Sequence, residues 1–310
     1  MGVVLLAALT GFAARPRMLW YVDEEYAAAW TRILQQHPSP IPRYEVRVRP
    51  AGGGMDFPKY RFGYIITRKG PEGERGGDAP VRQYRNLSQS REYDGWLALA
   101  LDPWMVFRKH QDPEPRRTFL EMRNDRGTLL LAGSDPAAAG AWLCQLLQES
   151  PGVFVQDREQ WDEAGRSLER NYPFQSGAFT YSWVQVWPVL LREKTAWLYA
   201  PLSQARTLAP YRMGLLDATR FPDPAGWNEY GMQADILWAG QRGSVRQRKK
   251  IDAVDNWLRS PETQTIIANT IDWIPAHPSG TPYNTISWET QMAWLRSSFI
   301  WQGADDAQDS

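Results

Sequence analysis

The sequence predicts an α/β fold, because short apolar runs typical of buried strands alternate with helical patterns along most of the chain. Its 310 residues, 43% of them hydrophobic, provide a substantial core and suit one large domain or two lobes. In open α/β sheets, ligands gather at the carboxyl ends of the strands. A binding site is therefore expected in the loops that follow the strands.

The opening segment has the pattern of strand, helix and strand. Residues 18–22 (MLWYV) form a short apolar run that suits a buried strand. Asp23 is expected to cap the helix that follows, whose first turn is acidic, as the helix dipole favours. Apolar residues recur at helical spacing as far as residue 36, and residues 44–48 alternate as a strand does.

The middle of the chain continues this alternation. Residues 60–67 are strand-like, and residues 96–107 hold two apolar runs broken by Asp102 and Pro103, the pattern expected of a hinge crossover. Further strands are expected over residues 128–132, 195–200 and 232–239, and helices over residues 136–148 and 161–168.

The last third is predicted to be mostly helical. Residues 245–269 form a long helical pattern that restarts at Ser260, which would cap a new helix with proline at its first position. Residues 273–282 are expected to be extended. A final helix is expected over residues 287–300, followed by a polar, flexible tail over residues 304–310.

Composition excludes some classes of function. Lys plus Arg and Asp plus Glu each number 35, so the chain lacks the basic excess of most nucleic-acid-binding proteins. A local basic patch over residues 242–250 (RGSVRQRKK) is either a binding surface or a solvated helix face. One cysteine and three histidines make a Cys/His zinc site unexpected, and no cofactor is predicted. Sixteen tryptophans are enough to leave several for stacking on a ligand.

The N-terminus resembles a secretory signal. Residues 3–14 (VVLLAALTGFAA) are too few to span a bilayer as a helix but suit the apolar part of a signal peptide. Leu9-Thr10-Gly11 resembles the start of a bacterial lipoprotein processing box, although Phe12 stands where that box needs cysteine. The segment is interpreted as signal-derived, with a buried first strand as the alternative. A periplasmic or extracytoplasmic location follows.

A family resemblance lies in residues 251–278. There a helix ends at Ser260-Pro261-Glu262-Thr263-Gln264, a second helix follows, and the chain leaves through Trp273-Ile274-Pro275. This arrangement resembles the extracellular solute-binding proteins of sugar-type ABC importers, also called periplasmic binding proteins. Residues 18–35, 101–107 and 194–200 resemble other parts of that family less strictly, although Arg108-Lys109 stands where the family usually has Tyr-Asn.

The resemblance implies a two-lobe periplasmic-binding-protein-like fold with crossover hinge strands. A small-molecule ligand, most simply a carbohydrate, would be captured between the lobes of a monomer and passed to a membrane ABC permease. The protein would then be a binding protein and not an enzyme. The implied parts are a signal-like segment (1–14), lobe 1 (15–102 plus 235–282), lobe 2 (103–234 plus 283–303) and the tail (304–310).

Candidate ligand residues lie in loops after the expected strands. Sugars offer apolar faces that stack on Trp or Tyr, and hydroxyls that need carboxylates or amides. Trp227 is the strongest candidate because glycines flank its loop, whereas any of the other aromatic residues can equally close the core. The candidates are Trp20, Tyr21, Asp23 and Glu24 in lobe 1, Asp102 and Trp104 near the crossover, and Trp183, Tyr199, Trp227, Asn228 and Tyr230 in lobe 2.

Three other functions stay open. A carboxylate-based glycan hydrolase leaves no sequence motif, and residues 23–25 offer acids at a strand end, although helix capping explains them as well. A polyamine-binding protein would also use aromatic residues and carboxylates to hold a cation. A protein-interaction role would rest on the tryptophans of residues 288–301, which core packing or lobe closure also explains.

Overall fold

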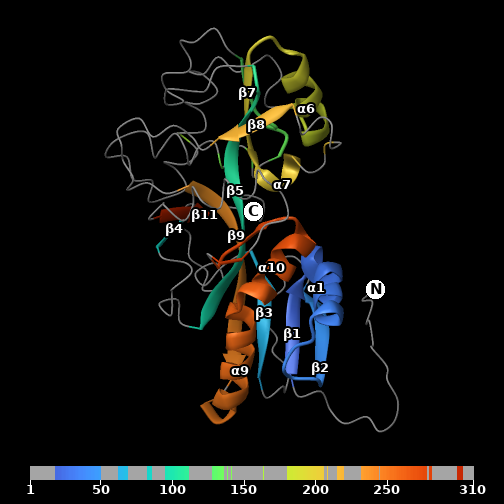
Figure 1. The fold of residues 1–310 in the computed structure, drawn as a ribbon, viewed down its shortest axis with the longest axis vertical. Coiled ribbons are helices and arrows are strands. Elements are labelled where there is room, and N and C mark those ends of the chain that lie inside the picture. Colours follow the sequence, from blue (N-terminus) through green and yellow to red (C-terminus); the bar gives the residue numbers. More distant parts are fainter. Residues whose placement is uncertain are drawn as a thin grey trace. The chain divides into compact units, whose positions relative to one another are not determined.

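The computed structural model describes the chain as two compact units (Figure 1). Unit 1 comprises residues 1–75, 87–101 and 236–282, and unit 2 comprises residues 76–86, 102–235 and 283–310. The residues described are 18–49, 62–68, 82–85, 95–111, 128–135, 138, 141, 163, 180–205, 208, 215–219, 232–243, 245–277, 279–280 and 299–302. Both long crossing strands, β5 (Trp96–Lys109) and β9 (Met232–Gly243), belong partly to each unit.

Unit 1 is built on a mixed sheet with the strand order β2-β1-β3-β9-β5. Strand β1 (Met18–Asp23) runs parallel to β2 (Tyr44–Arg49) and to β3 (Phe62–Thr67), and β9 returns antiparallel to β3. The short β10 (Ile274–Pro275) pairs antiparallel with β5. The carboxyl ends of β1, β2 and β3 therefore share one edge of the sheet.

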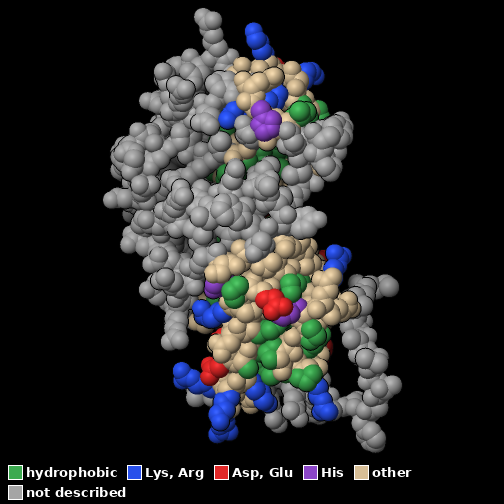
Figure 2. Space-filling view, viewed as in Figure 1, with side chains coloured by type: hydrophobic (Ala, Val, Ile, Leu, Met, Phe, Trp, Pro, Cys, Tyr) green, Lys and Arg blue, Asp and Glu red, His purple; other side chains and the backbone are tan. Residues whose placement is uncertain are grey.

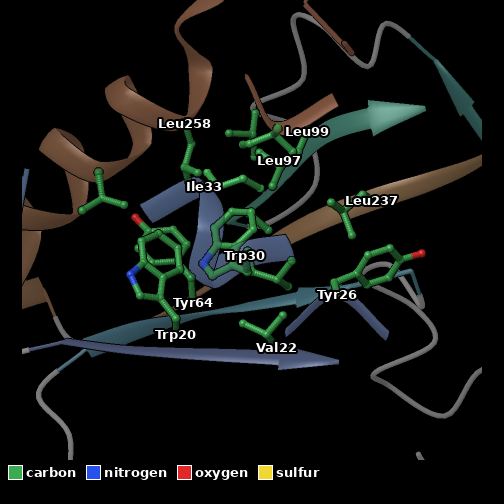
Figure 3. Close-up of a cluster of buried hydrophobic side chains, with 14 of the residues drawn as sticks. Trp20, Val22, Tyr26, Trp30, Ile33, Tyr64, Leu97, Leu99, Leu237 and Leu258 are labelled. Atoms are coloured by element: carbon green, nitrogen blue, oxygen red, sulfur yellow. The ribbon is translucent and has the colours of Figure 1, made fainter. Parts of the chain in front are cut away.

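Helices α1 (Glu24–Gln36), α9 (Arg248–Arg259) and α10 (Pro261–Ile271) pack on this sheet. The predicted helical spacing of α1 is confirmed, because its apolar residues at that spacing are all buried. They meet an aromatic core in which the Trp20 ring lies 5.2 Å from that of Trp30 and 5.3 Å from that of Tyr64. Figure 3 shows these rings among the aliphatic side chains of the core.

The restart predicted between α9 and α10 is confirmed. The Ser260 hydroxyl oxygen accepts a hydrogen bond from the Thr263 N–H at 3.2 Å, and Pro261 begins the helix. Helix α10 ends at Asp272, which adopts the left-handed conformation with φ of 65°. A preceding single turn, η2 (Val245–Gln247), leads into α9.

Unit 2 is arranged around the second half of β5. On its two edges β5 pairs antiparallel with β7 (Ala196–Pro201) and β8 (Leu216–Thr219), and β6 (Thr128–Leu130) runs parallel to β7. Helix α6 (Trp183–Arg192) packs here, with the Phe107 and Trp187 rings 5.2 Å apart, and α7 (Leu202–Ala205) follows β7.

The structure corrects three expectations about strands. Strand β5 is one uninterrupted strand of 14 residues, because partner strands continue its ladder on both sides of Asp102 and Pro103. Strand β9 runs on to Gly243, whose partner is Phe62 in β3.

The third correction concerns the predicted final helix. Residues 299 and 300 belong instead to β11 (Phe299–Gln302), which pairs with β4 (Arg82–Arg85) and with β9. Pairing with β4 satisfies the backbone groups of these residues in an extended conformation. Residues 287–298 lie outside the described part of the chain. Among the helices described, none is both long and apolar enough to cross a membrane.

Candidate functional site

Three of the predicted ligand residues come together in unit 2. Trp104 in β5 lies beside Trp183, the first residue of α6, with 6.2 Å between their ring centroids. On another side its ring lies 5.4 Å from that of Tyr199 in β7. Trp104 and Tyr199 are buried, whereas Trp183 is half-buried. We call Trp104, Trp183 and Tyr199 the aromatic cluster.

A carboxylate that the sequence did not single out as a ligand residue completes this cluster. The Trp183 Nε1–H donates a hydrogen bond to Asp135 Oδ2 at 2.6 Å. Asp135 stands in the turn after β6, where its backbone N–H donates to Ala132 O at 3.0 Å. The neighbouring Ser134 N–H donates to Tyr181 O at 3.1 Å, so the turn is joined to the segment that precedes α6.

Local sequence explains why Asp135 and Trp183 meet. Gly133-Ser134-Asp135 forms the turn that follows β6, and ligands in open α/β folds bind beyond the carboxyl ends of the strands. The start of α6 is held by Ser182, whose backbone N–H donates to Gln185 Oε1 at 2.8 Å. Position after a strand was therefore the signal that could have identified Asp135.

The chemistry of the cluster suits a small polar molecule. A half-buried indole offers a flat apolar face, and a neighbouring carboxylate can accept hydrogen bonds or balance a cation. Trp104 Nε1 is buried, and no acceptor for its N–H lies among the described residues. An aromatic face, a carboxylate and an indole donor thus occur within a few side chains of each other.

The acidic residues predicted for lobe 1 stand at the carboxyl edge of the unit 1 sheet. Tyr21 and Asp23 are half-buried and Glu24 is exposed. Asp23 occupies the N-cap position of α1 as expected, but its side chain makes no capping hydrogen bond. Its Oδ1 lies instead 3.7 Å from Nη1 of Arg49, a buried arginine directly opposite it in β2.

Arg68 and Trp273, neither of which the sequence suggested as a ligand residue, also belong to unit 1. The Arg68 guanidinium lies 6.0 Å from the centre of the Trp273 ring, and the ring of Tyr26 meets Trp273 edge-on at 5.9 Å. Arg68 directly follows β3, so it stands at the same edge of the sheet as Asp23 and Arg49. Only the parallel register of the strands brings these residues together, and composition carries no sign of it.

Two other candidates occupy structural positions. Trp20 is 0% exposed and lies within the unit 1 core between Trp30 and Tyr64. Asp102 is 3% exposed, and its carboxylate accepts hydrogen bonds from the backbone and the side chain of Ser203. Trp227, Asn228 and Tyr230 lie outside the described residues.

Metal donors are not gathered in the described segments. Among these residues no three His, Cys, Asp or Glu side chains lie together in a way that could hold a metal ion. The aromatic cluster with Asp135 and the polar edge of unit 1 are therefore the candidate binding features.

The strand order and the two units identify the fold of the chain. The chain has a two-lobe periplasmic-binding-protein-like fold, as the sequence predicted, in which β9 returns antiparallel between β3 and β5. No family model matches the chain, and no curated protein matches it. The fold is recognised through solved structures of low sequence identity.

Three of these structures illustrate the likeness. The bacterial solute receptor AcbH, with an exclusive preference for β-D-galactopyranose, is 15% identical, with a TM-score of 0.64 over 94% of this chain and 88% of its own. The Bordetella ferric binding protein is 12% identical, with a TM-score of 0.59 over 90% and 95%. An ABC transporter solute-binding protein from Agrobacterium radiobacter K84, in complex with ribitol, is 10% identical, with a TM-score of 0.58 over 92% and 88%.

Proposed function

We propose that the chain is the substrate-binding component of an ABC importer and binds a carbohydrate or a related small polar solute. The observation that carries the proposal is the aromatic cluster with Asp135, in a fold shared with receptors for galactopyranose and ribitol. An indole face can stack on the C–H face of a sugar, while a carboxylate accepts from its hydroxyls. A membrane ABC permease and an extracytoplasmic location belong to the same proposal.

A cationic solute such as a polyamine is the second candidate. The Trp183 ring beside the Asp135 carboxylate would also suit an ammonium group. In unit 1 the charge of Asp23 is balanced by Arg49, which favours a neutral ligand there. A ferric ion has less support, because the described residues gather no group of donors for it.

Calorimetric titration of the full chain tests the proposal. We would add D-galactose, ribitol and spermidine in separate experiments, and record the melting temperature with each, since a ligand specific to the folded state raises it. Saturable binding of a sugar or polyol supports the carbohydrate proposal. Binding of spermidine alone favours the cationic solute. In a separate incubation of the chain with an oligosaccharide, release of a shorter glycan would indicate a hydrolase.

Variants of the cluster link binding to these residues. Trp183→Ala and Asp135→Asn should each raise the dissociation constant by about 5- to 150-fold, because each removes a contact worth about 1–3 kcal/mol. Val184→Ala is the matched control, since Val184 follows Trp183 in α6 and is 83% exposed. If both cluster variants bind as the control does, the cluster is not the binding site.

A further inference from the structure

Lys109 is a buried cation of unit 2 to which the candidate site assigns no role. It is the last residue of β5, and its Nζ donates hydrogen bonds to Glu193 O and, at 3.4 Å, to Lys194 O. Burying an ammonium group is costly unless polar groups surround it. The two carbonyl oxygens therefore account for a lysine at this buried position.

Both carbonyl groups stand at the end of α6. Glu193 is the C-cap of this helix, and Lys194 directly follows it. The last carbonyls of a helix lack partners within the helix and carry the negative end of its dipole, so an ammonium group is favoured there. Arg192 and Lys194 are exposed, and Figure 2 shows Lys and Arg side chains on the surface at this end of unit 2. Lys109 differs from them because it caps α6 from the neighbouring strand.

The opposite end of α6 carries the half-buried indole of the aromatic cluster. Trp183 is the first residue of the helix, and its Nε1–H donates to Asp135 Oδ2 at 2.6 Å. Between the two ends, the ring of Trp187 meets that of Phe107 in β5 edge-on, with their centroids 5.2 Å apart. The helix that Lys109 caps is therefore the helix that presents Trp183.

One stretch of β5 reaches both ends of this helix. Trp104 lies beside Trp183 at the helix start, and Lys109 bonds to Glu193 O at the helix end. From Trp104 to Lys109 the strand advances roughly 17 Å, and from Trp183 to Glu193 the helix advances roughly 15 Å. The two lengths agree, so β5 holds α6 at its first and last residues.

The contacts at the two ends of α6 are directional. A hydrogen bond needs its donor and acceptor within a narrow range of distance and angle, whereas apolar packing is not directional and tolerates a small slide of the helix. The bond from Trp183 to Asp135 and the bonds from Lys109 to the last carbonyls therefore fix how far α6 lies along β5.

We propose that Lys109 is a positioning residue for solute binding. By holding the end of α6, it keeps the Trp183 indole where the ring can stack on a solute while its Nε1–H donates to Asp135. Lys109 does not touch the solute and acts through the helix. This inference rests on the proposed function, because it takes the Trp183 ring as part of the solute-binding site.

The indole N–H signals of the full chain in two-dimensional 1H–15N NMR spectra test the positioning without any solute. Lys109→Met keeps an apolar stem but removes the ammonium group, so it should shift the Trp183 signal, which is assigned from its absence in Trp183→Phe. Lys109→Arg keeps a cation with donors and should restore the signal. Arg192→Met is the matched control, because it removes an exposed cation from the last turn of the same helix and should leave the signal in place.

Solute titration of the same variants tests the consequence for binding. The dissociation constant of D-galactose or ribitol should rise about tenfold in Lys109→Met, the loss expected for one misaligned hydrogen bond, and should recover in Lys109→Arg. If neither solute binds the wild-type chain, the proposed function fails, whereas the Trp183 signal still shows whether Lys109 positions the ring.

Several outcomes would overturn the proposal. These are an unchanged Trp183 signal in Lys109→Met, or an equal shift in Arg192→Met. An equal change in the indole signal of Trp20, in the core of unit 1, would also overturn it, because the loss would then be one of general folding. A shifted Trp183 signal with an unchanged dissociation constant would show that Lys109 serves the structure of unit 2 alone.

Discussion

The carboxylate of Asp102 holds both polar groups of Ser203. Its Oδ1 accepts from the Ser203 backbone N–H at 2.9 Å, and its Oδ2 accepts from the Ser203 hydroxyl at 2.6 Å. Asp102 is the first unit 2 residue of β5, and Ser203 lies in α7 just after β7. The buried carboxylate therefore fastens α7 to the start of the unit 2 part of the crossing strand.

Removing this carboxylate should destabilise unit 2. Asp102→Ala leaves two donors of Ser203 without this acceptor, so the free energy of unfolding should fall by about 2–3 kcal/mol. Ser203→Ala removes only the hydroxyl bond and should cost about 1 kcal/mol. Urea unfolding followed by circular dichroism measures both, and the double variant should lose less than the sum. A loss of solute affinity with unchanged stability would instead make Asp102 a ligand residue.

Gln264 is predicted to hold the exit segment of unit 1. Its Nε2 donates to Ala98 O in β5 at 3.2 Å, and its Oε1 accepts from the His277 N–H at 2.6 Å. Gln264→Ala should lower the free energy of unfolding by about 2 kcal/mol, because both backbone groups lose a buried partner. Gln35→Ala, the same change at an exposed glutamine of α1, is the control and should change it by less than about 0.5 kcal/mol. Equal unfolding curves would contradict this role.

Gly240 is predicted to tolerate no side chain, because the ring of Trp96 lies against it. A Cβ at Gly240 would lie 2.6 Å from two ring atoms of this buried indole, which also carries the Arg242 guanidinium 5.5 Å from its centre. Gly240→Ala should therefore destabilise the fold by about 1–3 kcal/mol. In a double-mutant cycle with Trp96→Leu, the alanine should cost little once the ring is gone. Independent, additive losses would show that the clash is not the cause.

The stability of unit 1 should depend on pH through Asp255. Burial raises the pKa of the Asp255 carboxyl, and the hydrogen bond at 2.7 Å from the Tyr64 hydroxyl only partly opposes this. Since the folded-state pKa exceeds the usual value of 3.8, the stabilising contribution is full below that pH and is lost as pH rises through the folded-state pKa.

Asp255→Asn keeps an acceptor for Tyr64 but carries no charge. Its free energy of unfolding, relative to the wild type, should rise between acidic and neutral pH, where the wild-type carboxyl ionises. Tyr64→Phe should cost about 1 kcal/mol at neutral pH, because the carboxylate loses its donor. Urea unfolding at a series of pH values measures both, and a difference between Asp255→Asn and the wild type that does not vary with pH would contradict the prediction.

The helices and strands that depend on local sequence patterns were predicted well. Alternating apolar runs located β1, β2 and β3, helical spacing located α1, and Ser260-Pro261 marked the start of α10. These features depend on neighbours within a few residues, so the sequence carries them directly. Strand ends that depend on a distant partner were not predictable: β9 reaches Gly243 because β3 continues beside it, and β11 replaces a helical end because β4 and β9 pair with it.

The same distinction applies to the candidate site. Trp183 could be found as the first residue of a helix and Asp135 in the turn after a strand, but their contact depends on the fold of unit 2. Trp20 and Trp183 are the same kind of residue, in the third position of β1 and the first position of α6, yet one is fully buried and the other half-buried. The orientation of a side chain from its strand or helix decides between core and site, and a single sequence does not encode it in any short pattern.

The division of unit 1 into separate stretches of chain has a consequence for biosynthesis. Strand β3, all six residues of which are buried, borders β9, a strand translated much later. Until residue 243 has left the ribosome, one edge of β3 has no partner strand, and such an apolar edge invites pairing between nascent chains. A stalled fragment ending before β9 should therefore aggregate rather than fold, because the apolar edge of β3 has no strand to pair with.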